Sequence, residues 1–461
     1  MRMSRRGVLA SAIAGATAAS LPSRADALTS RLEEIRQAHD APGLAVAVVR
    51  DGQPIVLAHV GRASIGLDVP VTSRTLFHLG SVGKHITAVA ALRLVEAGKL
   101  SLDAPIGRYA PRLPPALADR PFHSLLTHTS GFPDYSAAVE WDRPFDRDTF
   151  YRLMAAYPPE FAAGTAWNYS NAAYVLIGYV IEDLAGKDYA RIVAEDLFAP
   201  AGVRDGRVDD AALPVRRRAE PYEWRDGLHV HATRMSTTVS SVAAGGILMP
   251  TSDVARWTGA LHGGALLSHD ALAQMTRPVR LKTGREIPYG FGWMLDHMPG
   301  GQPIHYHGGS VPGFRTVHIH LPRQGLSVMA MTNGDTLAAT IAGWEAAERH
   351  APDATPLSLP LLTDTAPALT RQAQAIVTGA PLDPAAFAPE MRLHLDAGRD
   401  HVVPRFTPAQ TATLHDLALV QDEPAGDGTR RRRYRAAFPG YVRHLTVHYL
   451  DNRRIGFMRI Q

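Results

Sequence analysis

This 461-residue chain is organised around one short stretch, Phe77-His78-Leu79-Gly80-Ser81-Val82-Gly83-Lys84. Residues 85–96 follow it with apolar side chains at helical spacing, so Ser81 lies at or near a helix start. There its hydroxyl stands beside unpaired backbone amides, and Lys84 follows one turn later on the same side. Such an amine can take the hydroxyl proton if burial or a second cation lowers its pKa. The alternative is a serine that caps the helix and a solvated lysine, so other motifs must decide.

A second motif, Tyr169-Ser170-Asn171, stands before a segment predicted to be a helix over 171–185. A serine/lysine pair needs a further group that carries the proton to the leaving atom. Tyr169-x-Asn171 supplies a phenol for that task, and the scarcity of asparagine makes a chance match improbable. The alternative is that Asn171 caps the helix and Tyr169 packs beneath it. Asn171 can do both.

The third motif is His307-Gly308-Gly309, which ends a predicted strand and precedes Ser310. Glycines at a strand edge let a substrate backbone approach closely. A second His-Gly-Gly copy, 262–264, stands at a predicted helix-to-loop junction, and this context favours the copy at His307.

In this order the three motifs resemble those of the serine penicillin-recognising hydrolases. This group includes class C β-lactamases, DD-carboxypeptidases, D-aminopeptidases and related esterases. Segments 125–131 (Leu-Leu-Thr-His-Thr-Ser-Gly) and 289–293 (Tyr-Gly-Phe-Gly-Trp) also resemble family signatures. The resemblance covers about residues 30 to 350. It implies an α+β fold with an antiparallel sheet, flanking helices and a mainly helical subdomain, like that of β-lactamases and penicillin-binding transpeptidases.

The resemblance also implies roles for the catalytic side chains. Ser81 would be the acylated nucleophile and Lys84 the amine that activates it. Tyr169 would act as general base and proton shuttle, while Asn171 orients substrate and lysine. His128 is expected to be structural, in a tight buried turn.

The remaining implied roles belong to the substrate-binding edge. His307, with Gly309, would take the place of the basic residue that binds a substrate carboxylate and tunes the tyrosine. The backbone amides of Ser81 and Ser310 would form the oxyanion hole. A helix start at Ser81 independently favours one of those amides.

The motif at His307 departs from class C β-lactamases, which usually carry Lys-Thr-Gly there. A neutral histidine offers less positive charge to a carboxylate, and Gly308 lacks the threonine hydroxyl. We therefore expect D-amino-acid-containing peptides as substrates, in a reaction of the DD-carboxypeptidase or D-aminopeptidase type. An esterase or a weak β-lactamase on the same site is the alternative. A further alternative is a non-catalytic, penicillin-binding-like sensor. Such a protein would lack the nucleophile, the lysine or the tyrosine, whereas this sequence has all three.

Composition narrows the other possibilities. The chain has no cysteine, so it has no disulfide and no thiolate metal site. The histidine pairs His305/His307 and His318/His320 share a strand face each, but without nearby carboxylates or a third spaced ligand we predict neither a metal nor another cofactor. The formal charge of +4 includes a net +3 within residues 1–27, so net charge does not support nucleic-acid binding. The expected partner is a small-molecule or peptide substrate, and the oligomeric state is left open.

Residues 1–27 have the features of a secretory signal: a charged start with Arg5-Arg6, a short apolar middle and an Ala-Asp-Ala end. The paired arginines favour the twin-arginine route. The apolar stretch is too short and too weakly apolar for a membrane anchor. We therefore expect a periplasmic or secreted protein with no stable membrane insertion after cleavage.

The rest of the chain is expected to form a catalytic domain over 28–350, a proline-rich linker over 351–367 and a small α+β domain of unknown role over 368–461. In the catalytic domain, helices stand between two early and three late strands, which predicts an antiparallel sheet completed by both ends. Those strands are expected at 43–50, 55–60, 304–307, 316–321 and 325–332. In the last domain two helices precede a four-stranded meander, whose strands are expected at about 414–421, 430–438, 441–450 and 454–460. Its arginine run, 430–433, is predicted to be a solvated edge.

Overall fold

The computed structural model describes residues 24–133, 135, 146–210, 212–232, 242–399, 403–451 and 453–461. Of the predicted signal peptide, only 24–27 fall in these ranges, at the start of helix α1 (Arg24–Ala38). The signal and the export route therefore stay predictions. Among the described helices, none is both long enough and apolar enough for a bilayer crossing.

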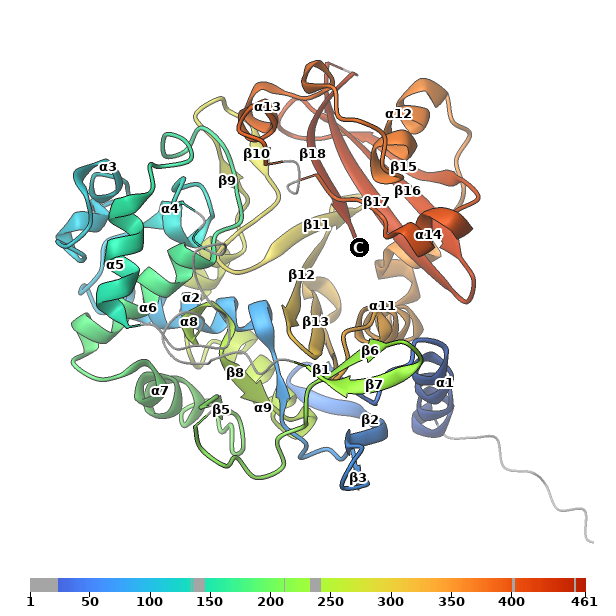
Figure 1. The fold of residues 1–461 in the computed structure, drawn as a ribbon, viewed down its shortest axis with the longest axis horizontal. Helices are drawn as coiled ribbons and strands as arrows, with labels where there is room; N and C mark the ends of the chain where they lie inside the picture. Colours follow the sequence, from blue (N-terminus) through green and yellow to red (C-terminus); the bar gives the residue numbers. More distant parts are fainter. Residues whose placement is uncertain are drawn as a thin grey trace, which may run out of the picture.

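Within the described residues, seven antiparallel strands form the main sheet, in the order β11-β12-β13-β14-β1-β2-β3 (Figure 1). They are β1 (Gly43–Arg50), β2 (Gln53–Ser64), β3 (Val69–Pro70), β11 (Met294–Met298), β12 (Gln302–Val311), β13 (Phe314–Leu321) and β14 (Leu326–Thr332). Leu44 of β1 lies opposite Thr332 of β14, so early and late strands meet in the middle of the sheet. The prediction of an antiparallel sheet completed by both ends is confirmed.

Alternation along the strands divides the sheet into two faces. Val317, Ile319 and Leu321 of β13 join one core, which α1 and α11 (Ala338–His350) cover. The alternate side chains of β13, among them His318 and His320, face the other side of the sheet. Helices α2 (Lys84–Glu96) and α9 (Thr251–His262) pack on that side.

The helical subdomain lies between the early and late strands, at the left of Figure 1. Helix α6 (Asn171–Ala185) is buried from Ala172 to Ile181 and shares the larger core with α2. The other helices here are α3 (Pro115–Ala118), α4 (His123–Leu126), α5 (Arg147–Ala156), α7 (Tyr189–Arg191), α8 (Val242–Gly245) and α10 (His269–Met275). Short strands also lie between the early and late strands in sequence: β4 (Phe77–His78), β5 (Arg207–Val208), β6 (Tyr222–Arg225), β7 (Leu228–His231), β8 (Ile247–Met249), β9 (Val279–Arg280) and β10 (Glu286–Ile287). The β6–β7 hairpin lies on the α1 side of Figure 1.

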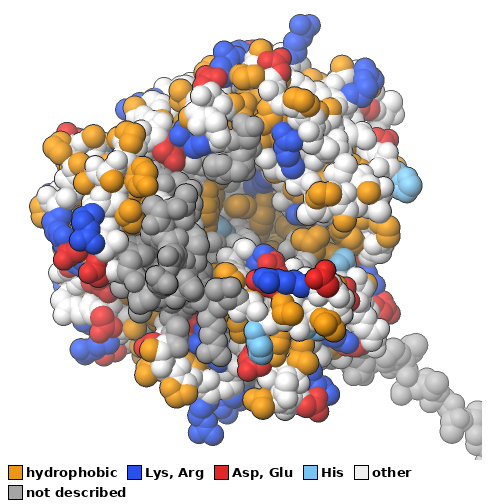
Figure 2. Space-filling model, in the orientation of Figure 1, with side chains coloured by type: hydrophobic (Ala, Val, Ile, Leu, Met, Phe, Trp, Pro, Cys, Tyr) orange, Lys and Arg blue, Asp and Glu red, His pale blue; other side chains and the backbone are white. Residues whose placement is uncertain are grey.

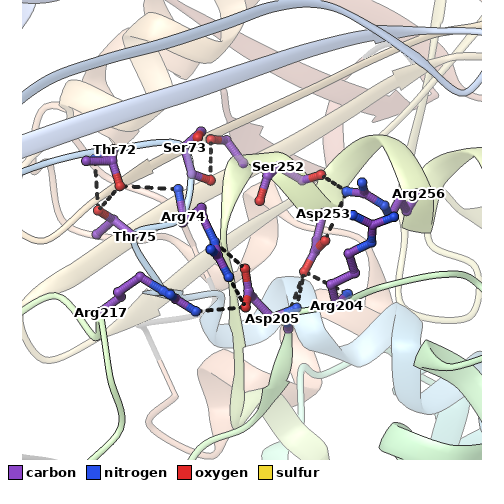
Figure 3. Close-up of polar contacts among 12 residues, drawn as sticks. Thr72, Ser73, Arg74, Thr75, Arg204, Asp205, Arg217, Ser252, Asp253 and Arg256 are labelled. Atoms are coloured by element: carbon purple, nitrogen blue, oxygen red, sulfur yellow. Dashed lines mark hydrogen bonds and ion pairs between the residues drawn. The ribbon is translucent and has the colours of Figure 1, made fainter.

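A polar network fixes the turn that precedes Ser81 (Figure 3). The buried Asp253, in the first turn of α9, accepts three consecutive backbone N–H groups, 204–206, at 2.7–3.1 Å. Asp205 in turn accepts both nitrogens of an Arg74 fork at 2.9 Å. The backbone N–H of Ser252 donates to the Ser73 carbonyl at 3.0 Å. The chain is thus anchored on α9 just before it enters β4.

The C-terminal part packs helices on a four-stranded antiparallel meander, at the upper right of Figure 1. Its described elements are α12 (Pro367–Val377), α13 (Pro389–Asp396), α14 (Pro408–Thr413), β15 (Leu417–Pro424), β16 (Arg430–Phe438), β17 (Tyr441–Leu450) and β18 (Arg454–Ile460). The meander and the helices α12 and α13 agree with prediction, whereas α14 is a further helix that the sequence pattern did not predict. The domain limits stay a prediction. The expected linker contains two 3₁₀ turns, 352–354 and 356–358, and Leu362 donates its N–H to the Leu419 carbonyl of β15.

The prediction of a solvated edge at the arginine run is wrong. Strand β16 is an interior strand, and Arg432 and Arg433 are fully buried. Arg433 pairs at 2.6 Å with Asp296 of β11, and Arg459 of β18 pairs with the same carboxylate at 2.6 Å. The run is buried because its partner lies on the edge strand of the main sheet, far away in sequence.

Charged side chains of both signs are dispersed over the face shown in Figure 2 and do not gather into one basic surface. That face is hollowed near its centre, between the C-terminal meander and the β6–β7 hairpin.

Candidate active site

Ser81 lies in a 3₁₀ turn, Gly80–Gly83, which runs directly into α2. No side chain caps either element, so the Ser81 hydroxyl is not used as a helix cap. Gly80 has a φ of 52°, in the left-handed region where glycine is favoured. The local backbone therefore presents the serine at a helix start with its hydroxyl free for other partners.

Lys84 is completely buried and touches three oxygen atoms. Its Nζ lies 3.1 Å from Ser81 Oγ, 2.8 Å from Asn171 Oδ1 and 2.6 Å from the Ala244 carbonyl. Burial holds the pKa of Lys84 well below its usual range. The two carbonyl oxygens can only accept, so they take the two N–H groups of a neutral amine. The nitrogen lone pair then faces the Ser81 hydroxyl.

Tyr169 completes the cluster with its ring against the amine. Lys84 Nζ lies 4.8 Å from the ring centroid. The Tyr169 hydroxyl oxygen is buried and, within the described residues, makes no hydrogen bond. Burial raises the pKa of Tyr169, and the nearby Ser81 hydroxyl opposes part of that rise. The phenol is therefore protonated at neutral pH.

Asn171 belongs to the site and does not cap α6. The cap is Ser170, whose hydroxyl accepts the Ala173 N–H at 3.2 Å. Asn171 is the first helical residue, and its exposed amide instead holds Lys84. The expectation that Asn171 serves both purposes is corrected, because the preceding serine already supplies the capping oxygen.

Two glycines bring β12 against the Ser81 turn. A Cβ on Gly309 would lie 2.0 Å from the Leu79 carbonyl oxygen, and a Cβ on Gly80 would lie 2.8 Å from the Ser310 nitrogen. Val311 and Phe314 are opposite each other and flank a two-residue turn. Residues that flank such a turn are the hydrogen-bonded kind of pair, and this kind alternates with the non-hydrogen-bonded kind along an antiparallel ladder. Ser310 therefore occupies a non-hydrogen-bonded position, with its N–H directed away from β13. The two segments of the predicted oxyanion hole are in contact.

His307 is buried beside this edge, but neither of its ring nitrogens is free. Nε2 lies 3.0 Å from the Tyr289 hydroxyl, and Nδ1 lies 2.7 Å from the Gly308 carbonyl. Burial and the neighbouring Lys84 lower the pKa of His307 to about 3. The expected contact between His307 and a substrate carboxylate is therefore not prepared in this geometry, because both nitrogens already serve internal partners.

The other histidine motifs lie apart from this cluster. His262, of the second His-Gly-Gly copy, stacks on His320 with 3.6 Å between ring centroids. His305 faces His320 across β12 and β13, and His307 faces His318. In the part of the chain that the structure describes, no three His, Cys, Asp or Glu side chains are placed to hold a metal ion.

Sequence reasoning missed two members of the site. The Ala244 carbonyl holds Lys84, but a backbone oxygen on an alanine leaves no signal in the sequence. Tyr289 did carry a signal, since it begins the Tyr-Gly-Phe-Gly-Trp run that resembled a family signature.

Comparison with known proteins decides the family. The family model described as Beta-lactamase matches residues 28–351. The chain belongs to the beta-lactamase family, and it is a serine hydrolase. Over 318 residues it is 30% identical to a penicillin-binding protein of Bacillus subtilis (strain 168), covering 63% of this chain and 68% of that protein. Over 332 residues it is 32% identical to Esterase EstB of Burkholderia gladioli, covering 62% of this chain and 84% of the esterase.

A D-aminopeptidase of Gluconobacter oxydans (strain 621H) is 29% identical over 338 residues, covering 67% of this chain and 59% of that protein. Among solved structures, the D-amino acid amidase from Ochrobactrum anthropi SV3 has a TM-score of 0.59 at 25% identity, covering 67% of this chain and 91% of the amidase. An octameric penicillin-binding protein homologue from Pyrococcus abyssi has a TM-score of 0.64 at 18% identity and covers 95% of this chain and 100% of its own. The last match shows a shared fold that extends beyond the family domain.

Proposed function

We propose that this serine hydrolase cleaves D-amino-acid-containing peptides, or their amides, through an acyl-enzyme on Ser81. The observation that carries the proposal is the contact between Ser81 Oγ and the buried Lys84 Nζ, whose other two contacts are pure acceptors. That arrangement makes Lys84 the base for Ser81 at neutral pH.

Acylation follows from this geometry. Ser81 Oγ attacks the carbonyl carbon of the substrate while its proton passes to Lys84 Nζ. The carbonyl oxygen becomes an oxyanion between the amides of Ser81 and Ser310. The bond to the leaving nitrogen or oxygen then breaks, and that atom receives the proton from Lys84 by way of the Tyr169 hydroxyl. Because Tyr169 is protonated at rest, its part is to relay a proton, and the first acceptor is Lys84.

Deacylation repeats the steps with water. Water attacks the acyl carbonyl, its proton passes to Lys84, and the ester bond to Ser81 Oγ breaks. The acid product leaves, and Ser81 recovers its proton. Asn171 holds Lys84 in place throughout.

The names of the relatives support the substrate class. A D-aminopeptidase and a D-amino acid amidase are among them, and an esterase shares a larger part of its length with this chain than the D-aminopeptidase does. Esters remain the alternative substrates on the same site, because an acyl-enzyme forms from either bond.

The test is a panel of D-alanyl amides, p-nitrophenyl esters and a chromogenic cephalosporin, followed by intact-mass detection of an acyl adduct. Ser81→Ala should lower turnover at least about 1,000-fold and abolish the adduct without changing thermal unfolding. Ser101→Ala, in an exposed loop, serves as the matched serine control. Turnover by Ser81→Ala near the wild-type rate would refute the nucleophile. A wild-type enzyme that hydrolyses esters but no D-amide would refute the substrate class.

A further inference from the structure

A chain of four hydrogen bonds runs through the buried wall of the site and ends beside β12. The Ser170 N–H lies 3.1 Å from His128 Nδ1, and His128 Nε2 lies 3.1 Å from the Tyr289 hydroxyl. That hydroxyl lies 3.0 Å from His307 Nε2, and His307 Nδ1 lies 2.7 Å from the Gly308 carbonyl. His128, Tyr289 and His307 are all nearly inaccessible to solvent.

The two ends of this chain determine the direction of its outer bonds. The Ser170 N–H can only donate, so His128 Nδ1 accepts, and the proton of the neutral ring sits on Nε2. The Gly308 carbonyl can only accept, so His307 Nδ1 donates. Burial also lowers the pKa of His307 to about 3, so its ring is neutral and its Nε2 accepts from the Tyr289 hydroxyl. That hydroxyl then accepts from His128 and donates to His307.

The backbone at His128 shows that this ring is held in place. His128 has a φ of 59°, an uncommon conformation for a residue with a side chain. Its ring lies 4.3 Å, 5.2 Å and 4.8 Å from the rings of Tyr169, Tyr174 and Tyr289, measured between centroids. A left-handed residue fixed among three tyrosines gives the chain a rigid starting point.

In the part of the chain that the structure describes, the charged and titratable groups around His307 do not offer a replacement cation. Lys84 faces it from α2 but is engaged by three oxygens, and Tyr169 faces it as a neutral phenol. His318, opposite on β13, is buried, and burial holds its pKa well below the usual range. Arg315, opposite Ser310 on the same strand, pairs with Asp335 and donates to two backbone carbonyls.

We propose that His128 and Tyr289 are positioning residues that keep His307 neutral and turned inward, so that the site selects substrates without a carboxylate on the leaving group. The preferred leaving groups are then ammonia, amines, carboxamide-ended residues and alcohols, as in aminopeptidase, amidase or esterase action. A free carboxyl-terminal residue, or the carboxylate of a β-lactam, would meet no positive charge among the described residues at this edge. The proposal rests on the proposed function and names its substrate class more closely.

A matched substrate pair tests the selectivity in the wild-type enzyme. D-Alanyl-D-alanyl-D-alanine and its carboxamide-ended counterpart share the same scissile bonds and differ in the charge of one terminal group. We expect kcat/KM for release of the terminal residue to be at least about tenfold higher for the carboxamide. Equal values, or a preference for the acid, would overturn the proposal. Hydrolysis of neither compound by an enzyme that still hydrolyses esters would refute the D-peptide class itself, with Ser81 unaffected.

Tyr289→Phe tests the positioning role, because it removes only the hydroxyl that links the two histidines. His307 Nε2 then loses its donor and becomes free to take a proton. We expect a new ionisation on the acid limb of the kcat/KM profile and a severalfold smaller preference for the carboxamide. Tyr189→Phe is the matched control, since it removes a similarly buried hydroxyl, 2.5 Å from the Thr87 hydroxyl, that has no contact with the hydrogen-bonded chain among the described residues.

If Tyr289→Phe folds and keeps both the wild-type pH profile and the wild-type preference, the positioning role is wrong. If it fails to fold, ¹⁵N spectra of histidine-labelled wild-type enzyme decide, with His307→Gln used for assignment. A neutral ring protonated on Nδ1 is expected, and a ring protonated on Nε2 or on both nitrogens would overturn the proposal.

Discussion

Close backbone approach joins the two halves of the site, and single glycines make it possible. Gly309 lets β12 pass over the Leu79 carbonyl, and Gly80 adopts a left-handed φ directly beneath Ser310. The amides of Ser81 and Ser310 can face one oxyanion only because no Cβ separates the two segments. The Ser-x-x-Lys motif identifies the hydroxyl and the amine, but it does not predict this close approach of two backbone segments.

Gly309→Ala should therefore be far more damaging than Gly308→Ala, although the two residues are neighbours. At Gly309 the new methyl would meet backbone at 2.0 Å, whereas at Gly308 the nearest atom is 4.0 Å away and the position is exposed. We expect Gly309→Ala to lower kcat/KM at least about 100-fold, as loss of an oxyanion donor does. Gly308→Ala should stay within about tenfold of wild type. Esterase kinetics on both purified variants, with circular dichroism for folding, measure this, and similar losses for both would contradict it.

The side chains of the site could be predicted from the sequence because each lies in a short motif with a chemical reason. Ser81, Lys84, Tyr169 and Asn171 lie together in the structure as the motifs suggested. What could not be predicted depends on distant contacts. The engagement of His307 by Tyr289 requires two strands and a loop to be placed first.

At the scale of elements, the local sequence pattern was sufficient to predict where an element begins and ends if the pattern is regular along that element. Strand β1 and helix α6 begin and end as predicted, and so do the last three strands of the meander. The arginine run failed because charge alone does not show whether a strand is at an edge. The burial of Arg433 depends on its ion pair with Asp296, which lies more than 130 residues earlier in the sequence.

Asp296→Asn tests that junction between β11 and the C-terminal meander. The substitution keeps the shape of the side chain but leaves Arg433 and Arg459 buried without a carboxylate. We expect a loss of about 3–5 kcal/mol in the free energy of unfolding, because breaking a buried ion pair strands a charge. Urea unfolding measures it. Glu223→Ala, which removes an exposed partner of Arg225, is the control and should cost less than about 1 kcal/mol. Comparable losses would show that the Asp296 cluster contributes no more than a surface pair.

At the scale of the whole molecule, the C-terminal part is attached to the catalytic wall. His394 Nε2 lies 3.0 Å from the Trp167 carbonyl, two residues before Tyr169. Phe457 of β18 packs against the Trp167 ring, which in turn contacts Tyr289. The meander therefore supports both chain segments that lead into the site. The Pyrococcus abyssi homologue, which covers nearly the whole chain, shares this overall fold.

Buried histidines should make the whole molecule sensitive to mild acid. Burial lowers the pKa of His85, His305 and His307 to about 3 and that of His262 to about 4, against about 6.5 in an unfolded chain. Between these values the unfolded chain binds more protons than the folded one, so the free energy of unfolding falls as pH falls. Stability is complete above about pH 6.5 and is progressively lost toward pH 3 to 4.

We therefore expect urea unfolding to show a loss of several kcal/mol between pH 7 and pH 5, since each histidine contributes up to about 1.4 kcal/mol per pH unit. Over this window ordinary carboxylates stay ionised in both states, so the histidines dominate the slope. His262→Gln removes one titrating ring from the stack with His320 and should reduce the slope. A free energy of unfolding that does not change between pH 7 and pH 5 would mean that these rings are solvated in the folded protein, contrary to the packing described above.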